Sequence, residues 1–98
     1  MLILPDDRRI FVGDTGTLIS VDTLSDLTGA TTALIKYIKP SGSRGSWGGT
    51  LNGTRIEYRT QTGDLDEIGD YKIYVYVELP DWSGHGEVDI MTVSEEGT

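Results

Sequence analysis

The chain has 98 residues and a formal net charge of −8, with 8 Lys and Arg residues against 16 Asp and Glu residues. A chain of this length has one small core that buries about 60–65% of the unfolded surface, so we expect residues 1–98 to form a single domain that gains stability from neighbouring subunits. The acidic charge repels phosphate backbones, which argues against nucleic acid as a partner. The chain has no Cys, which excludes disulfides, thiolate metal sites and a Cys nucleophile.

The N-terminal segment is apolar at Leu2, Ile3 and Leu4 and is interrupted by Pro5. It is too short for a signal-peptide core or a membrane span, so we expect a soluble protein that is not classically secreted and has no membrane partner. We expect residues 1–7 to form an arm that lies on a neighbouring subunit or adds a strand to an exposed sheet edge. The alternative is an edge strand of the protein's own sheet.

Apolar and polar residues alternate with a period of two along most of the chain, which predicts strands rather than helices. The pattern is clearest over residues 71–79, where the odd-numbered positions are predicted to face the core and the even-numbered positions to face outward. In chain order, the predicted strands cover residues 8–12, 17–23, 33–39, 46–51, 55–60, 71–79 and 86–94. The alternating pattern is weakest over residues 8–12 and 46–51.

The connections between these strands are rich in turn residues. The best helical candidate, residues 21–27, contains poor helix formers and is predicted to be a loop or a single turn. Asn52 and Gly53 predict a tight hairpin, because both residues tolerate the positive φ of a type I′ turn. Residues 95–98 are expected to form a flexible C-terminal end.

The predicted strand over residues 86–94 changes its pattern along its length. Val88 and Ile90 lie on one parity, whereas Met91 and Val93 lie on the other. A bulge near Ile90 or burial on both faces of the strand would explain this change.

About seven short strands in a chain of this size predict an all-β fold, an immunoglobulin-like β-sandwich of two antiparallel sheets. Residues 67–71 resemble the tyrosine corner of such domains, in which the hydroxyl of a tyrosine, here Tyr71, bonds to the backbone upstream. Ile73 would then occupy the position at which antibody domains have a cysteine. The alternative for Tyr71 is an ordinary inward tyrosine at the start of a strand.

Residue types that support catalysis are few. His85 is the only histidine, and its neighbours Asp81 and Ser83 are too close in sequence to reach the geometry of a hydrolytic triad. The acidic run over residues 64–70 resembles a calcium loop, but two of the required ligand positions carry apolar side chains. We therefore expect no enzyme activity, no metal and no cofactor.

Several residues are candidate contacts with a partner. Arg44 and Trp47 lie in a glycine-rich stretch, and Trp82 and His85 lie in a second predicted loop. Trp and Arg are enriched at interface hot spots, which favours contact with another subunit. The alternative for either Trp is to fold back over the end of the core. Exposed indoles would also allow binding of a glycan.

Four phrases of the sequence occur in a recognisable order: Gly13-Asp14-Thr15-Gly16, Asp26-Leu27-Thr28-Gly29-Ala30-Thr31, Lys39-Pro40-Ser41-Gly42 and Gly69-Asp70-Tyr71. This order resembles the immunoglobulin-like N-terminal domain of siphophage upper baseplate proteins and related small phage virion proteins, over roughly residues 10–94. In that family the domain is non-enzymatic and attaches receptor-binding or fibre components to the tail tip.

The resemblance implies a bacteriophage virion structural protein of the tail, baseplate or neck. Such a protein docks other phage virion proteins, is present in multiple copies, and is assembled into the virion in the host cytoplasm. The long C-terminal part of the family has no counterpart after Thr98, so we expect a small stand-alone virion protein. The alternatives are a capsid decoration protein and a carbohydrate- or cell-surface-binding module that uses the Trp loops.

Overall fold

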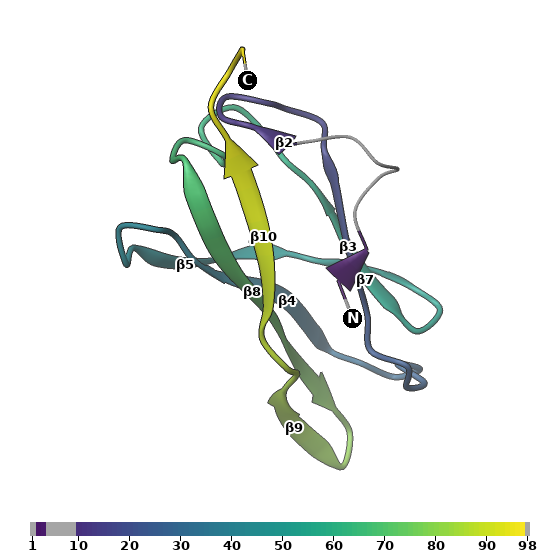
Figure 1. Cartoon of the computed structure of the whole chain (residues 1–98). Helices are drawn as coiled ribbons and strands as arrows, with labels where there is room; N and C mark the ends of the chain where they lie inside the picture. Colours follow the sequence, from purple (N-terminus) through teal and green to yellow (C-terminus); the bar gives the residue numbers. More distant parts are fainter. Residues whose placement is uncertain (1, 4–9, 98) are drawn as a thin grey trace.

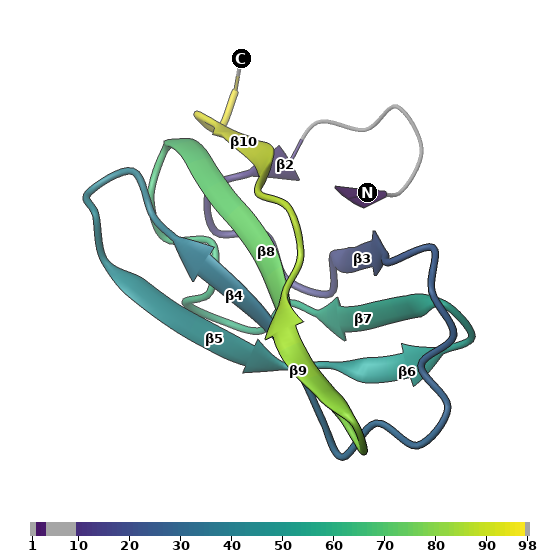
Figure 2. The same ribbon diagram turned by 90° about the horizontal axis from the view of Figure 1, so that it is seen from below.

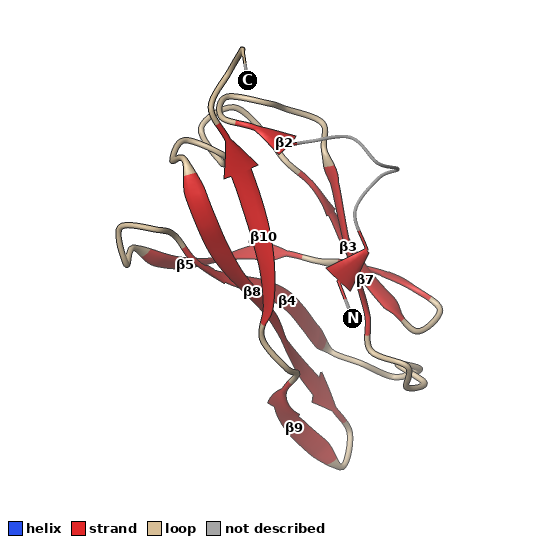
Figure 3. Ribbon diagram, viewed as in Figure 1, coloured by secondary structure: helices blue, strands red, loops and turns tan. Residues whose placement is uncertain are grey.

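In the computed structural model, residues 2–3 and 10–97 are described, and they form two β-sheets that pack face to face (Figures 1 and 3). The first sheet has the strand order β1 (Leu2–Ile3), β3 (Leu18–Asp22), β7 (Arg55–Arg59), β6 (Thr50–Asn52). The second sheet has the order β2 (Ile10–Phe11), β10 (Asp89–Ser94), β8 (Gly69–Leu79), β4 (Thr32–Ile38), β5 (Arg44–Gly48), and β9 (Trp82–His85) pairs with β8. These residues include no helix, and thus none with the length and apolar character to cross a membrane.

The strand order confirms the predicted immunoglobulin-like sandwich. When the strands are lettered along the chain, β1-β3-β7-β6 corresponds to the ABED sheet and β10-β8-β4-β5 to the GFC sheet extended by C′. Within the described residues, the strand pairs are antiparallel except for β10 and β2, which are parallel over two residues. Seven of the ten described strands have four or more residues, and the three shorter ones lie at sheet edges (Figure 2).

The core lies between the inner faces of the two sheets. β8 contributes Tyr71, Ile73, Val75 and Val77, all buried as their alternation predicts. The opposite sheet and the remaining strands and loops add the other buried apolar side chains: Ile10, Ile19, Val21, Leu27, Ile35, Trp47, Ile56, Leu65, Met91 and Val93. Residues 23–31, which connect β3 to β4, contain no helix, so the prediction of a loop is confirmed.

The N-terminal segment pairs within its own sheet. Leu2 lies opposite Val21 and Ile3 lies opposite Ser20, so the alternative of an edge strand holds for these two residues. Leu4 and most of the predicted arm lie outside the described residues. At the other end, residues 95–97 follow β10 outside any strand, and residue 98 is not described.

The segment predicted as one strand over residues 46–51 is divided between the two sheets. β5 ends at Gly48 and β6 begins at Thr50, and Gly49 between them donates its amide to the Ala33 carbonyl at 3.0 Å. A Cβ at Gly49 would clash with a methyl group of Ile56. The chain therefore passes from one sheet to the other at a position where only glycine fits.

We predict that Gly49→Ala lowers the free energy of unfolding by about 1–3 kcal/mol, because the added methyl overpacks the contact with Ile56. Gly48→Ala is the matched control, since a Cβ at Gly48 meets nothing within 4 Å. Urea unfolding measures both variants. Equal unfolding midpoints for the two would contradict the close crossing at Gly49.

The hairpin between β6 and β7 forms as predicted, but its turn is shifted by one residue. Asn52 is the last residue of β6, and the two central residues of the turn are Gly53 and Thr54. Gly53 has a φ of +64°, and Thr54 is not among the positive-φ residues. Positive φ at the first central residue alone is typical of a type II′ turn rather than the expected type I′.

The last part of the chain contains a β-bulge. Tyr76 pairs with His85 in β9, whereas Ile73 pairs with Asp89 in β10. Between these two pairs, β8 has two residues, 74 and 75. The segment that faces it, which connects β9 to β10, has three residues, 86–88. The extra residue defines a bulge between β9 and β10, and a bulge of this kind reverses the face toward which later side chains point.

This bulge lies before Ile90 and does not account for the two parities, because Ile90, Met91 and Val93 alternate regularly within β10. Met91 and Val93 point into the core and are buried. Val88 and Ile90 are 55% and 53% exposed, so burial on both faces of the strand is wrong.

The predicted tyrosine corner is present. Tyr71 is fully buried at the start of β8, and its hydroxyl accepts a hydrogen bond of 3.1 Å from the backbone amide of Glu67, four residues upstream. Ile73 is buried two residues later, at the position of the antibody cysteine. The corner fixes the connection between β7 and β8 against the core.

Tyr71→Phe is expected to cost about 1–2 kcal/mol of stability, because it leaves the Glu67 amide without its partner. Tyr37→Phe serves as the control, since the Tyr37 hydroxyl makes no hydrogen bond to the described residues and its ring is half-buried in the core. Chemical denaturation of both variants measures the difference. A loss for Tyr71→Phe no larger than that for Tyr37→Phe would rule out a stabilising corner.

Candidate binding site

The single histidine lies on β9, which pairs with the end of β8. Ser83 and His85 lie on β9 opposite Glu78 and Tyr76. The His85 ring lies 4.9 Å from the ring of Tyr76 and 5.9 Å from the ring of Tyr74. The histidine thus contacts two tyrosines of β8.

The acidic run over residues 64–70 consists of separate structural contacts. Asp64 accepts a hydrogen bond of 2.6 Å from the Tyr58 hydroxyl, and burial together with this carboxylate raises the pKa of Tyr58 to about 12. Asp66 forms an ion pair with Lys39 at 2.5 Å. In the described part of the chain, no three His, Cys, Asp or Glu side chains come together as metal ligands.

Two phrases that carry the family resemblance lie against each other. Ser41, in the turn between β4 and β5, donates hydrogen bonds from its amide and its hydroxyl to Glu67, both of 2.9 Å. In the same place, a Cβ at Gly69 would lie 2.9 Å from Cγ of Pro40. Gly69 also has a φ of +127°, which favours glycine. The turn and the tyrosine corner thus form one packed end of the sandwich.

The ion pair at this end makes a testable contribution to stability. The hydrogen bond from Lys39 holds the pKa of Asp66 below its ordinary value, so the stabilisation is present above the ordinary carboxyl pKa and is lost as the pH falls through the lower value in the folded protein. We expect Asp66→Asn to cost about 0.5 kcal/mol at pH 7 and less at pH 3. Urea unfolding at both pH values measures this, with Asp81→Asn as the exposed control. A difference from wild type that is the same at both pH values would contradict the assignment.

Trp47 lies in the core. It is only 6% exposed, and its ring stacks on Tyr58 at 5.1 Å and contacts Tyr37 at 4.5 Å. The position follows from β5, in which Trp47 lies opposite the buried Ile35. Trp47 is therefore removed from the candidate partner contacts, and the alternative of packing over the core holds. Arg44, at the start of the same strand, is exposed.

Trp82 has the opposite environment. It begins β9 and is 56% exposed, on the β8–β9 hairpin that projects from one end of the sandwich (Figure 1). A Cβ at Gly84 would lie 2.5 Å from the indole ring, so the indole lies flat over this glycine. The hairpin thus presents a large, positioned aromatic surface to solvent.

The indole forms part of the wall of a groove between the two sheets, which has a volume of about 580 Å³. One wall is made by β8 and β9, and the other by the end of β3 and the loop that follows it. Its apolar lining residues are Val21, Leu24, Leu27, Val75, Val77, Leu79 and Trp82. The volume and the apolar lining are typical of binding pockets rather than of packing defects.

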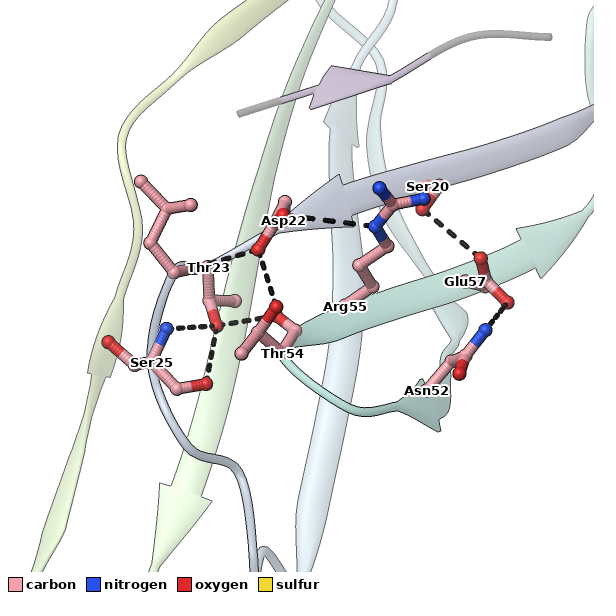
Figure 4. Close-up of polar contacts among 9 residues, drawn as sticks. Ser20, Asp22, Thr23, Ser25, Asn52, Thr54, Arg55 and Glu57 are labelled. Atoms are coloured by element: carbon pink, nitrogen blue, oxygen red, sulfur yellow. Dashed lines mark hydrogen bonds and ion pairs between the residues drawn. The ribbon is translucent and has the colours of Figure 1, made fainter.

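The loop wall of this groove is held in an unusual backbone conformation. Leu24 has a φ of +58° and is 77% exposed, although a large side chain disfavours this region. The Leu24 amide donates to Asp22 at 2.9 Å, and the Thr54 hydroxyl donates to the same carboxylate at 2.7 Å. Thr23 adds a hydrogen bond of 2.7 Å to the Thr54 carbonyl (Figure 4). This network fixes Leu24 at the groove.

The mouth of the groove is acidic. The hydrogen bond from the Leu24 amide, followed by that from Thr54, lowers the pKa of Asp22 below its ordinary value. Arg55 is 3.8 Å from Asp22 and balances part of its charge. Glu87 also lines the groove. A bound group is therefore expected to combine an apolar part with a positive charge.

A second surface is the outer face of the six-stranded sheet, which we define by nine residues: Leu34, Lys36, Ile38, Lys72, Tyr74, Tyr76, Glu78, His85 and Ile90. The register places these side chains on one side of β4, β8, β9 and β10. Lys36 lies 5.2 Å from the Tyr76 ring centroid, and the Tyr76 hydroxyl donates to Glu78 at 2.8 Å. This bond raises the pKa of Tyr76.

The sequence identified some of these residues and missed others. Trp82 and His85 were predicted as contacts and lie at the groove. Leu24 was missed, because nothing in its local pattern indicates exposure. Tyr74 and Tyr76 were predicted to face outward, and two tyrosines on the wet side of one strand were the available signal for a binding face.

No model of a known protein family, no curated protein and no solved structure matches the chain.

Proposed function

We propose that this chain is a non-enzymatic bacteriophage virion structural protein that docks other virion proteins of the tail, baseplate or neck. The observation that carries the proposal is the apolar groove beside the exposed Trp82. An indole in an exposed, apolar site is typical of an interface hot spot. The order of the sequence motifs supports the virion context.

The chemistry of the groove favours one kind of occupant, an extended segment of another virion protein. Its walls accept a large apolar side chain, and the carboxylates of Asp22 and Glu87 favour a neighbouring Lys or Arg. Among the described strands, β9 pairs only with β8, so its other edge is open to an added strand. Addition of a strand to a sheet edge is a common mode of peptide recognition.

Trp82→Ala tests this proposal in purified particles. We expect the variant to weaken attachment by about 30-fold, as is typical of the loss of a hot-spot aromatic, and so to be depleted from virions. Its stability is expected to stay near that of wild type, since the side chain is half-exposed. Ile68→Ala is the matched control, because Ile68 is 54% exposed in the connection before β8 and does not line the groove.

Quantitative mass spectrometry of the particles gives the readout. Absence of the wild-type protein from particles overturns the virion role. Incorporation of Trp82→Ala at the level of Ile68→Ala overturns the role of the groove. Antibody labelling in electron micrographs separates a tail location from the alternative, capsid decoration.

The half-exposed indole also favours a second candidate, binding of a glycan on the cell surface, because sugars stack on flat aromatic rings. Trp82 alone can act in this way, since Trp47 is buried. Glycan-array binding by the wild-type protein that disappears in Trp82→Ala would favour this candidate over protein docking.

A further inference from the structure

The outer face of the six-stranded sheet differs in charge from the rest of the protein. The chain as a whole has a formal net charge of −8. On the outer face and its rim, however, the register places three cations, Lys36, Arg44 and Lys72, against two carboxylates, Asp70 and Glu78. Two copies that repel each other elsewhere can approach through this face, because it carries no excess of negative charge.

The charges on this face are arranged so that one copy complements another. Lys72 and Glu78 lie on the same side of β8, with Tyr74 and Tyr76 between them. Six residues of strand separate the two charges by about 20 Å. A strand that carries a cation at one end, two aromatic residues in the middle and an anion at the other end is complementary to itself when it is reversed.

We propose that two copies of this chain dock through their outer faces around a two-fold axis that crosses the strands at the level of Val75. The axis lies in the plane between the docked outer faces of the two copies and is perpendicular to the strands. The two β8 strands therefore face each other and run in opposite directions. Lys72 of one copy then faces Glu78 of the other copy, and Tyr74 faces Tyr76 of the other copy. This is an isologous interface, in which each contact occurs twice.

The neighbouring strand fits the same symmetry. On β4, Ile38 lies opposite Lys72 and Thr32 lies opposite Glu78. The axis therefore brings Lys36 over Leu34 of the other copy, where the alkyl part of the lysine covers an apolar side chain. Half-exposed aliphatic and aromatic side chains form the centre of the proposed interface. The charged side chains of Lys72 and Glu78 lie toward the ends of the interface. This is the distribution of an interface with an apolar core and a polar rim.

The face is small, so the dimer is expected to be reversible. Four strands spaced by about 4.8 Å and seven residues of about 3.3 Å each cover only a few hundred Å². Interfaces at the lower end of the size range are transient, so association is expected to depend strongly on protein concentration. The test of the dimer is separate from the test of the groove partner, because Lys72 and Glu78 do not line the groove.

Sedimentation equilibrium of the full chain over a range of concentrations tests the dimer. Lys72→Glu places like charges opposite each other and is expected to weaken association by ~10-fold or more. Glu78→Lys is expected to do the same. The double variant with both substitutions restores opposite charges and is expected to return the Kd to within ~3-fold of wild type. Arg59→Glu is the control, since it changes the net charge equally on the other sheet.

Each result decides the proposal. Weakening by both single variants with rescue by the double variant supports the antiparallel arrangement. Wild-type protein that stays monomeric at about 1 mM overturns the dimer. Weakening by the single variants without rescue, or equal weakening by Arg59→Glu, overturns the geometry. Thermal unfolding of each variant confirms that a loss of association is not a loss of fold.

Discussion

The structure depends on the pairing and alternation of one strand, β8. It pairs with β4 over seven residues on one side and with β10 and β9 on the other, so it is the centre of the six-stranded sheet. Because successive side chains point to opposite faces, its odd-numbered residues build the core and its even-numbered residues, from Lys72 to Glu78, form the outer face. A one-residue change of register would bury those charges and expose the core side chains.

The same geometry separates two surfaces on a very small domain. The bulge between β9 and β10 lets β9 present Trp82 to the groove while β10 directs Met91 into the core and Ile90 outward. We propose a segment of another protein as the occupant of the groove and a second copy of the chain as the partner of the outer face. A domain with two contacts of this kind would link partners in pairs, as a component of a symmetric assembly does.

The sequence predicted the features that depend on neighbouring residues. The alternation of β8 and the tyrosine corner at Tyr71 were predicted correctly, because both arise from spacing along one strand. Features that depend on contacts between residues far apart in the sequence were not predicted. The crossing at Gly49 needs Ile56, and the burial of Trp47 needs its place opposite Ile35. The composition of the outer face could not be predicted from the sequence either, because Leu34 lies beside Tyr76 only when β4 pairs with β8.

Chemical nitration of the tyrosines, read by mass spectrometry at several protein concentrations, tests the division of β8 between core and docking face most directly. The account predicts that Tyr71 stays unmodified at every concentration, because it is fully buried. Tyr74 and Tyr76 are expected to react in dilute solution and to become protected as the concentration rises. Modification of Tyr71 in the folded protein, or reactivity of Tyr74 and Tyr76 that does not change with concentration, would contradict it.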